Sequence, residues 1–269
     1  MKRWALAGAA LGALVALVSF APAAWLAQGV AQGTEGRLLL ADARGTLWRG
    51  SAVLVLTGGA GSRDASALPG RLQWTLGLDG AALALRARQA CCIEGELKLR
   101  LVPGLGRLRL ELPGTAGAAG VSEAPAMVLL GQWPASWLVG LGTPWNTMQP
   151  SGTLQLSSAG LVAEAVQGRW IFSGQGELQL RGLASSLSTL EELGSYRLLL
   201  QGDARGDAAQ LQLSTISGVL QLSGSGQWAA SKLRFNGQAS AAPGSEAALG
   251  NLLNIIGRRQ GALSLISIG

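Results

Sequence analysis

Leucine alternates with polar residues at every second position along most of this chain. Successive side chains of a strand point to opposite faces, so the alternation predicts strands with one buried face and one face of Gln, Ser or Arg. Turns with Gly, Asp or Pro separate the strands and indicate antiparallel connections. The sequence therefore predicts a mainly β fold, a curved or twisted meander-type sheet with a few short helices. The alternating stretches are RLQWTLGL (71–78), GELKLRLV (95–102), GRLRLEL (106–112), GTLQLSS (152–158), GELQLRGL (176–183), AQLQLST (209–215), GVLQLSGSG (218–226) and KLRFNGQAS (232–240).

Three short segments have helical character instead. They are PASWLVGL (134–141), SSLSTLEELG (185–194) and GSEAALGNLLNIIG (244–257). In the last of them Leu249, Leu252, Leu253 and Ile256 share one face, and Gly257 follows as a stop signal. We expect this helix to cover an open end of the sheet and the terminal ALSLISIG to pair with a sheet edge.

The N-terminal segment has the character of a membrane anchor. An uncharged apolar run follows Lys2 and Arg3, and Trp4 and Trp25 lie 21 positions apart, about 31 Å in a helix, with Leu14 midway. Tryptophans at both ends suit the two interfaces of a bilayer, and the basic pair places the N-terminus in the cytoplasm. The segment predicts one transmembrane helix before the β-rich body. A cleaved signal peptide is the alternative, since Ala-Pro-Ala at 21–23 offers a cleavage site.

The expected organisation follows from these features. Residues 1–27 form the cytoplasmic tip and the anchor, and residues 28–269 form a β-rich domain outside the cytoplasm. The stretch LPGTAGAAGVSEAP (112–125) is rich in Gly, Ala and Pro and divides this body into two halves, 28–120 and 125–269. The halves share a Gly-Xaa-Leu-Xaa-Leu vocabulary, either from an internal duplication or from leucine strands in general.

Composition disfavours most enzyme classes. The chain has no histidine, which excludes Ser-His-Asp and Cys-His catalysis and removes the commonest metal ligand. A pair of carboxylates is the acid–base chemistry left open, and the acidic residues show no pairing that points to it. The 21 basic residues are scattered without a basic cluster, which disfavours nucleic acid as a partner. We expect a protein that is not an enzyme and has no catalytic residues, metal or cofactor.

The two cysteines, Cys91 and Cys92, are adjacent. Neighbouring strand residues point to opposite faces, so a bridge between them would need a distorted peptide. An even number of cysteines outside the cytoplasm is nevertheless typical of a disulfide. We expect the pair to contribute packing and no required bridge.

Four stretches together resemble the type II secretion system protein N family, and more distantly the AsmA-like exported β proteins. The Trp-Pro-Ala-Ser-Trp and Thr-Pro-Trp-Asn-Thr phrases of the third stretch are the most specific. The four are the N-terminal anchor, ARGTLWRGSAVL (43–54), LLGQWPASWLVGLGTPWNTMQPSGTLQLSS (129–158) and NLLNIIGRRQGALSLISIG (251–269). The resemblance implies a single-pass protein of the bacterial inner membrane with a periplasmic domain. It also implies an accessory or assembly role in protein transport by the type II secretion apparatus, through binding to other secretion components.

Four tryptophans are candidate interaction or packing residues. Trp48 lies between Gly45 and Gly50, where the segment predicts two strands around a turn or bulge. The others are Trp133, Trp137 and Trp145, in a segment stiffened by prolines. Each ring suits either packing on the sheet or presentation to a partner. The alternative function is a lipid-handling AsmA-like module, in which an incompletely covered leucine face forms an apolar trough.

Overall fold

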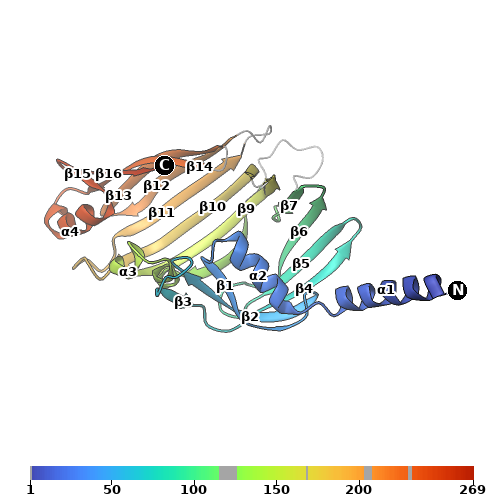
Figure 1. Cartoon of the computed structure of the whole chain (residues 1–269). Coiled ribbons are helices and arrows are strands. Elements are labelled where there is room, and N and C mark those ends of the chain that lie inside the picture. Colours follow the sequence, from blue (N-terminus) through green and yellow to red (C-terminus); the bar gives the residue numbers. More distant parts are fainter. Residues whose placement is uncertain (1, 115–125, 168, 203–207, 230–231) are drawn as a thin grey trace.

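A computed structural model describes residues 2–114, 126–167, 169–202, 208–229 and 232–269. Figure 1 shows one large, curved antiparallel sheet with short helices at its margins. The helices are α1 (Lys2–Ser19), α2 (Ala23–Gly33), η1 (Ala135–Leu141, a 3-10 helix), α3 (Trp145–Met148) and α4 (Glu246–Ile256). The strands are β1 (Leu38–Gly45), β2 (Arg49–Thr57), β3 (Ala65–Ala67), β4 (Leu72–Asp79), β5 (Ala82–Arg88), β6 (Leu97–Gly104), β7 (Arg107–Glu111), β8 (Val128–Pro134), β9 (Pro150–Val166), β10 (Arg169–Ser185), β11 (Gly194–Gly202), β12 (Ala208–Gly218), β13 (Leu220–Ala229), β14 (Lys232–Ala241), β15 (Arg258–Gln260) and β16 (Leu263–Ile268).

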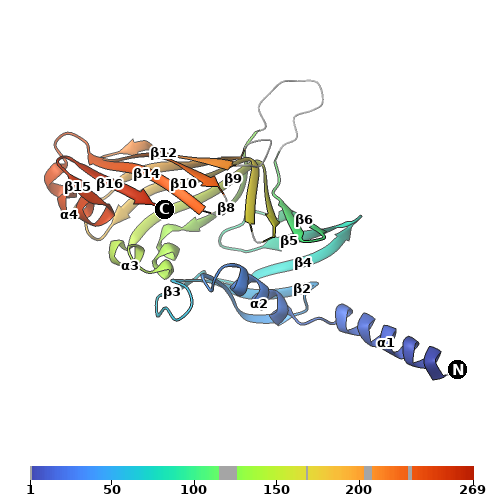
Figure 2. The ribbon, with the colours of Figure 1, turned by 45° about the horizontal axis from the view of Figure 1, so that its top comes forward.

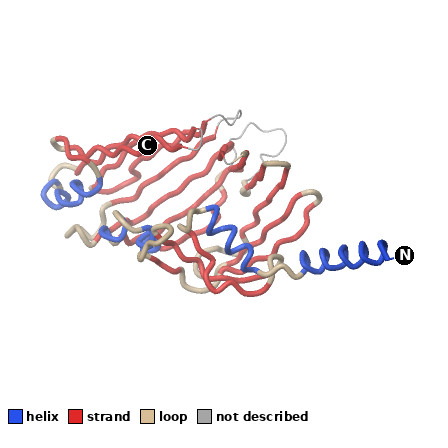
Figure 3. Tube along the Cα trace, viewed as in Figure 1, coloured by secondary structure: helices blue, strands red, loops and turns tan. Residues whose placement is uncertain are grey.

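Nearly every strand pairs with its neighbour in sequence, as the predicted meander requires. The order is β1-β2-β4-β5-β6-β7-β9-β10-β11-β12-β13-β14-β16-β15, with β3 on β2 and β8 on β9. The strands β9 and β10, each of 17 residues, run along the middle of the sheet (Figure 3). Two strands share one edge of β9: β8 pairs with the first half of β9, and β7 pairs with the second half. The mainly β antiparallel fold is confirmed.

The strand registers give the sheet two different faces. Leucines lie opposite leucines from strand to strand, as in the rows Leu83–Leu101–Leu110 and Leu178–Leu198–Leu213. We call this side of the sheet the inner face, and the side with the intervening polar residues the outer face. The alternation in the sequence therefore becomes one apolar surface that runs from β4 to β16.

The helix α2 covers the inner face at the N-terminal end of the sheet (Figure 2). Ala23 is 1% exposed and packs with Leu40, Ala52 and Trp74, and Leu26 and Val30 border the same cluster. The predicted organisation placed residues 23–27 in the anchor, whereas here they begin a helix of the folded body.

The helix α4 covers the other end, as the sequence predicted. Leu249, Leu252 and Leu253 are fully buried among β11, β13 and β14 side chains. Ser264 of β16 donates its hydroxyl to the Leu253 carbonyl at 2.6 Å, which ties the helix to the final strand. The terminal strand pairs with β14, and β15 folds back on it. The predicted cover and edge pairing are both confirmed.

The predicted transmembrane helix from Trp4 to Trp25 is interrupted. The helix α1 ends at Ser19, and Pro22 has extended dihedrals of −69° and 148° before α2 begins. Proline fixes its own φ and disfavours helix for the residue before it. Trp25 therefore lies on α2, away from Trp4. Over the described residues, no helix combines the length and apolar character that a membrane crossing needs.

The predicted helix over 185–194 is wrong. The Ser185 and Ser188 hydroxyls accept the N–H groups of Leu187 and Leu190 at 3.3 and 3.1 Å. Such local side-chain bonds compete with the helical ladder and favour turns. The leucines of this turn segment still pack on the α4 cluster. Their apolar side chains therefore contribute to the core, but the prediction assigned them the wrong backbone conformation.

The predicted division of the body falls largely on residues 115–125, which lie outside the described residues. On either side of that segment, β7 pairs with β9 from Arg107 opposite Val166 to Glu111 opposite Val162. The sheet is thus continuous between the two expected halves.

Substitutions on α4 test how the helix docks. We expect Leu253→Asp to lower the free energy of unfolding by at least about 3 kcal/mol, because it replaces a buried leucine with a charge among aliphatic side chains. On the same helix Ile255 is 41% exposed, and Ile255→Asp should cost about 1 kcal/mol or less. Urea unfolding followed by circular dichroism measures both, and equal losses would show that α4 does not dock through Leu253.

Candidate functional site

The stretch GTLWRG makes the sharp turn between β1 and β2. Gly45 lies opposite Gly50, as the predicted strand pair requires. A Cβ at Gly50 would overlap the ring of Trp74, which comes from the neighbouring strand β4 and is 4% exposed. The Trp74 indole donates to the Leu47 carbonyl at 3.0 Å. The glycine therefore makes room for a tryptophan that is distant in sequence.

Trp48 itself lies outside that cluster and is half-buried. Its indole N–H donates to the Val18 carbonyl at the end of α1, at 2.8 Å. Its own carbonyl accepts the N–H of Leu76 on β4 at 2.7 Å. Trp48 thus connects the end of α1 to the sheet, a contact that the sequence alone did not indicate.

The other three tryptophans lie along the connection from β8 to β9. The ring of Trp133 lies over Gly131, whose Cβ would be 2.6 Å from Cη2 of that ring. The Trp137 indole donates to the Ser66 carbonyl of β3 at 3.0 Å. Trp145 is half-buried in α3. Trp137 thus contacts β3, Trp133 lies on β8, and Trp48 lies in the β1–β2 turn.

The same connection packs against β2, β3 and the loop before β3. Gly140 of η1 lies so close to β2 and β3 that a Cβ there would be 2.7 Å from the Ser66 nitrogen. Asn146 donates to the Asp64 carboxylate at 3.3 Å. The sequence analysis missed both Gly140 and the Asn146–Asp64 pair, because their partners are about 80 residues away in the chain.

Cys91 and Cys92 form a disulfide, contrary to the expectation of unbridged packing residues. The expectation assumed that both cysteines lie in a strand, but they lie in the turn between β5 and β6. The Gln89 carbonyl accepts the N–H groups of Cys92 and Ile93, at 3.2 and 3.1 Å, and closes that turn. Cys91 is exposed, Cys92 is buried, and the Cys92 carbonyl accepts the Gln132 N–H of β8 at 2.7 Å.

The inner face is open between α2 and α4. We call this region the central apolar face. Its residues are half-buried, and none belongs to the clusters around the two helices. They are Leu83, Leu99, Leu101, Leu110, Leu178, Leu198, Leu200 and Leu211. A continuous row of partly exposed leucines is typical of a binding surface.

The sheet curls towards the central apolar face. Phe172 of β10 and Trp228 of β13 have ring centroids 5.7 Å apart in an edge-to-face contact. Three strand steps of a flat sheet would separate them by about 14 Å. The Trp228 indole also donates to the Trp170 carbonyl at 3.1 Å. The curl gives the apolar face the shape of a trough where β10 begins and β13 ends.

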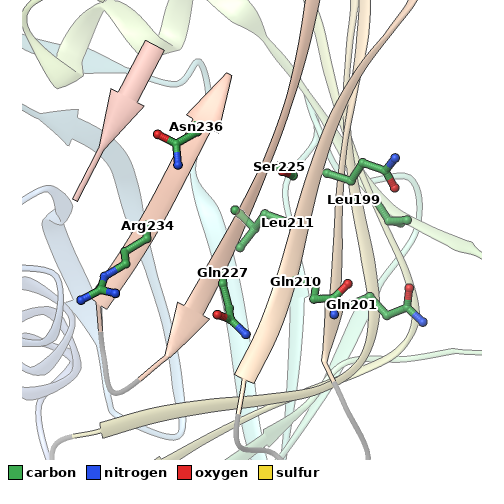
Figure 4. Close-up of a pocket in the computed structure, with 10 residues that line it drawn as sticks. Leu199, Gln201, Gln210, Leu211, Ser225, Gln227, Arg234 and Asn236 are labelled. Carbon is green, nitrogen blue, oxygen red and sulfur yellow. The ribbon is translucent and has the colours of Figure 1, made fainter. Parts of the chain in front are cut away.

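The outer face of β11–β14 is rich in amide side chains. Gln201, Gln210, Gln227 and Arg234 lie opposite one another on successive strands. They line a shallow cavity of about 580 Å³ together with Asn236 and Ser225 (Figure 4). The cavity lining has one charged residue, Arg234, and no aromatic side chain. It therefore has neither a cluster of charges nor a ring on which a ligand could stack.

Both terminal edges of the sheet are protected against strand addition. Asp42 has a φ of 49° within the bulge of β1, and Arg71 binds its carboxylate at 2.7 Å and its carbonyl at 2.6 Å. Hydrogen bonds from Arg44 and Arg71 lower the pKa of Asp42. At the other end, β15 has only three residues, of which two are arginines. A bulge and a short basic strand are common protections of sheet edges.

The described residues contain no group of three or more metal-ligating side chains. Tyr196 is the residue with the most perturbed acid–base behaviour, since burial, and secondarily Glu192, raises the pKa of its phenol. Its hydroxyl donates to the Leu220 carbonyl at 2.9 Å, a structural contact within the α4 cluster.

The family model of type II secretion system protein N matches residues 36–265, from the turn after α2 into the final strand. The chain belongs to this family. Membership assigns it to protein transport by type II secretion and indicates the cell envelope. The curated proteins and the solved structures contain no match to this chain. The matched residues cover the sheet from β1 into β16, including the central apolar face.

The close approach at Gly50 gives a direct test of the first turn. We expect Gly50→Ala to destabilise the protein by about 1–3 kcal/mol, because the added methyl overlaps the Trp74 ring. Gly77 of β4 has open space at its Cβ position, and Gly77→Ala should be neutral or stabilising by up to about 1 kcal/mol. Thermal unfolding compares the stability of the two variants with that of the unsubstituted protein. If Gly50→Ala were as stable as the unsubstituted protein, the Trp74 ring could not lie against Gly50.

The disulfide gives a second test. The described residues contain no free cysteine, so a maleimide mass tag should not react with the denatured, unreduced protein. After reduction the tag should add twice. A single or double addition before reduction would show that the cysteines are unpaired.

Proposed function

We propose that this protein is an accessory or assembly component of the type II secretion apparatus at the inner membrane, and that it acts by binding other secretion components. The observation that carries the proposal is the central apolar face, which the helices leave uncovered between α2 and α4. Both sheet edges are protected, so a partner would approach this face and not the edges. In this proposal the protein acts by binding and not by catalysis.

We further propose that α1 attaches the protein to the inner membrane, with the N-terminus towards the cytoplasm and the sheet in the periplasm. Among the α1 side chains that the structure describes, Leu11 is 63% and Val15 57% exposed. Its 18 residues extend about 27 Å, close to the thickness of the hydrocarbon core. Because α2 packs on the sheet, we place the boundary between anchor and domain at the link between α1 and α2.

Two neighbouring positions on β11 test the binding face. Leu200 lies on the central apolar face, and Leu199 lies on the outer face beside Gln201. With a photoreactive residue at each position in turn, we expect a crosslink to a subunit of the secretion apparatus from 200 and not from 199. Mass spectrometry of the product identifies the subunit. Crosslinks from 199 alone would assign binding to the outer face.

A lipid-handling role is the second candidate, and the curl of the sheet favours it. The Phe172–Trp228 contact narrows the trough over a surface made of half-buried leucines. Aliphatic walls of this kind can shield acyl chains from water. The same photoreactive residue at 200 distinguishes the candidates, because a phospholipid adduct would replace the protein crosslink.

Retention of the N-terminal segment is a separate prediction. Ala21 and Ala23, which occupy the minus-three and minus-one positions of the alternative signal-peptide cleavage site, are 2% and 1% exposed. The Ala21 carbonyl accepts the Leu47 N–H at 2.7 Å, so this link is part of the folded body. We expect the mature protein to begin at Met1 or Lys2 in intact-mass measurements. A mature N-terminus at Ala24 would identify a cleaved signal peptide.

A further inference from the structure

We propose that the tips of the β4–β5 and β6–β7 hairpins dock on the lipid surface from which α1 emerges. This proposal rests on the membrane attachment through α1 proposed above. It assigns the contact to two side chains, Leu78 and Leu105, and to a bilayer with anionic headgroups.

Leu78 and Leu105 are the most exposed large apolar side chains in the described part of the β-rich body. They are 81% and 103% exposed. Leu78 precedes the turn at Gly80, and Leu105 lies in the turn with Gly106. A Cβ at either glycine would meet nothing within 4 Å. Both leucines therefore stand on narrow tips that no other part of the described chain covers.

The two tips lie at the same end of the sheet. Strands β5 and β6 pair with Leu83 opposite Leu101, close to both turns. The disulfide-bonded turn that joins β5 to β6 is at the opposite end. A flat surface at this end would thus meet both leucines together.

A chain of contacts ties this end of the sheet to the exit of α1. The Val18 carbonyl, near the end of α1, accepts the Trp48 indole N–H at 2.8 Å. The Trp48 carbonyl accepts the N–H of Leu76, two residues before Leu78, at 2.7 Å. Figures 1 and 2 both show the β4–β5 tip on the side of the molecule from which α1 projects. A membrane that holds α1 would therefore lie beside the tips.

The charges at the tips suit anionic headgroups. Asp79 follows Leu78, and Arg100 neutralises it with an ion pair of 3.2 Å. Arg107 follows the second turn and is exposed, with no carboxylate at ion-pair distance in the described residues. Basic residues beside inserted apolar side chains strengthen binding to anionic lipid. Among the described residues, Arg107 therefore places one positive charge beside the second tip that no ion pair compensates.

The shape of the tips favours lipid over a protein partner. A protein interface buries roughly 800 Å² on each side around a packed core. Two single leucines on separate turns provide no such core. A bilayer interface accepts isolated side chains at separate points, because its acyl chains fill the space between them.

Fluorescence in vesicles tests the docking. Since the native cysteines are paired, Leu78→Cys and Leu105→Cys each give one position in the full-length protein for an environment-sensitive dye. Ile216→Cys is the matched control, because Ile216 is 46% exposed at the opposite end of the sheet. Leu11→Cys reports on α1. Each labelled protein is reconstituted into vesicles of phosphatidylcholine and phosphatidylglycerol that contain a headgroup-proximal nitroxide lipid for positions 78, 105 and 216. For position 11, which lies near the middle of α1, the vesicles contain a lipid with the nitroxide in the middle of its acyl chain.

We expect the nitroxide to quench the dyes at 78 and 105 and to shift their emission to shorter wavelength relative to detergent, with no change at 216. Quenching at 11 without quenching at 78 and 105 would overturn the docking and leave the attachment through α1 in place. Absence of quenching at 11, 78 and 105 together would overturn the attachment and the docking with it.

Discussion

The continuous backbone ladder from β1 to β15 is the constraint on which the rest of this structure depends. Several of the antiparallel pairs keep leucine opposite leucine, so the ladder gathers the apolar side chains on one side of a single sheet. No second sheet in the described residues faces that side, and α2 and α4 cover only its ends. The sheet therefore keeps apolar surface in contact with solvent, which an ordinary two-layer domain would bury.

Because its edges are protected and its apolar face is open, the sheet favours partners that bind to the face. The bulge at Asp42 and the short basic β15 discourage a further strand from joining the sheet. The central apolar face has no such protection. Partners of the secretion apparatus, or acyl chains in the second candidate function, would gain free energy mainly by covering leucines. The hydrogen bond from the Trp48 indole to the Val18 carbonyl connects α1 to the sheet. If α1 attaches the protein to a membrane as proposed, this contact would help to orient the apolar face relative to that membrane.

Much of the fold could be predicted from local patterns, since alternation determines strands and the stripe on α4 determines its buried face. The failures have local physical causes. Pro22 divides the N-terminal apolar segment into two helices, although hydropathy alone predicts one. In the 185–194 segment the leucines have helical spacing, but the Ser185 and Ser188 hydroxyls bind backbone N–H groups and favour turns. The candidate site was predicted only in outline, because the curl at Phe172 and Trp228 depends on strands that are distant in sequence. The pairing of Gly50 with Trp74 is hidden for the same reason.

Solvent access to the leucine face tests the central claim most directly. Single cysteines at Leu200 on the central apolar face, Leu199 on the outer face and Leu252 under α4 can be labelled with a small maleimide in the purified protein. Leu200 and Leu199 are half-buried, whereas Leu252 is fully buried. We expect positions 200 and 199 to react at comparable rates in the folded protein, and position 252 only after unfolding. A position 200 as unreactive as position 252 would contradict an open apolar face.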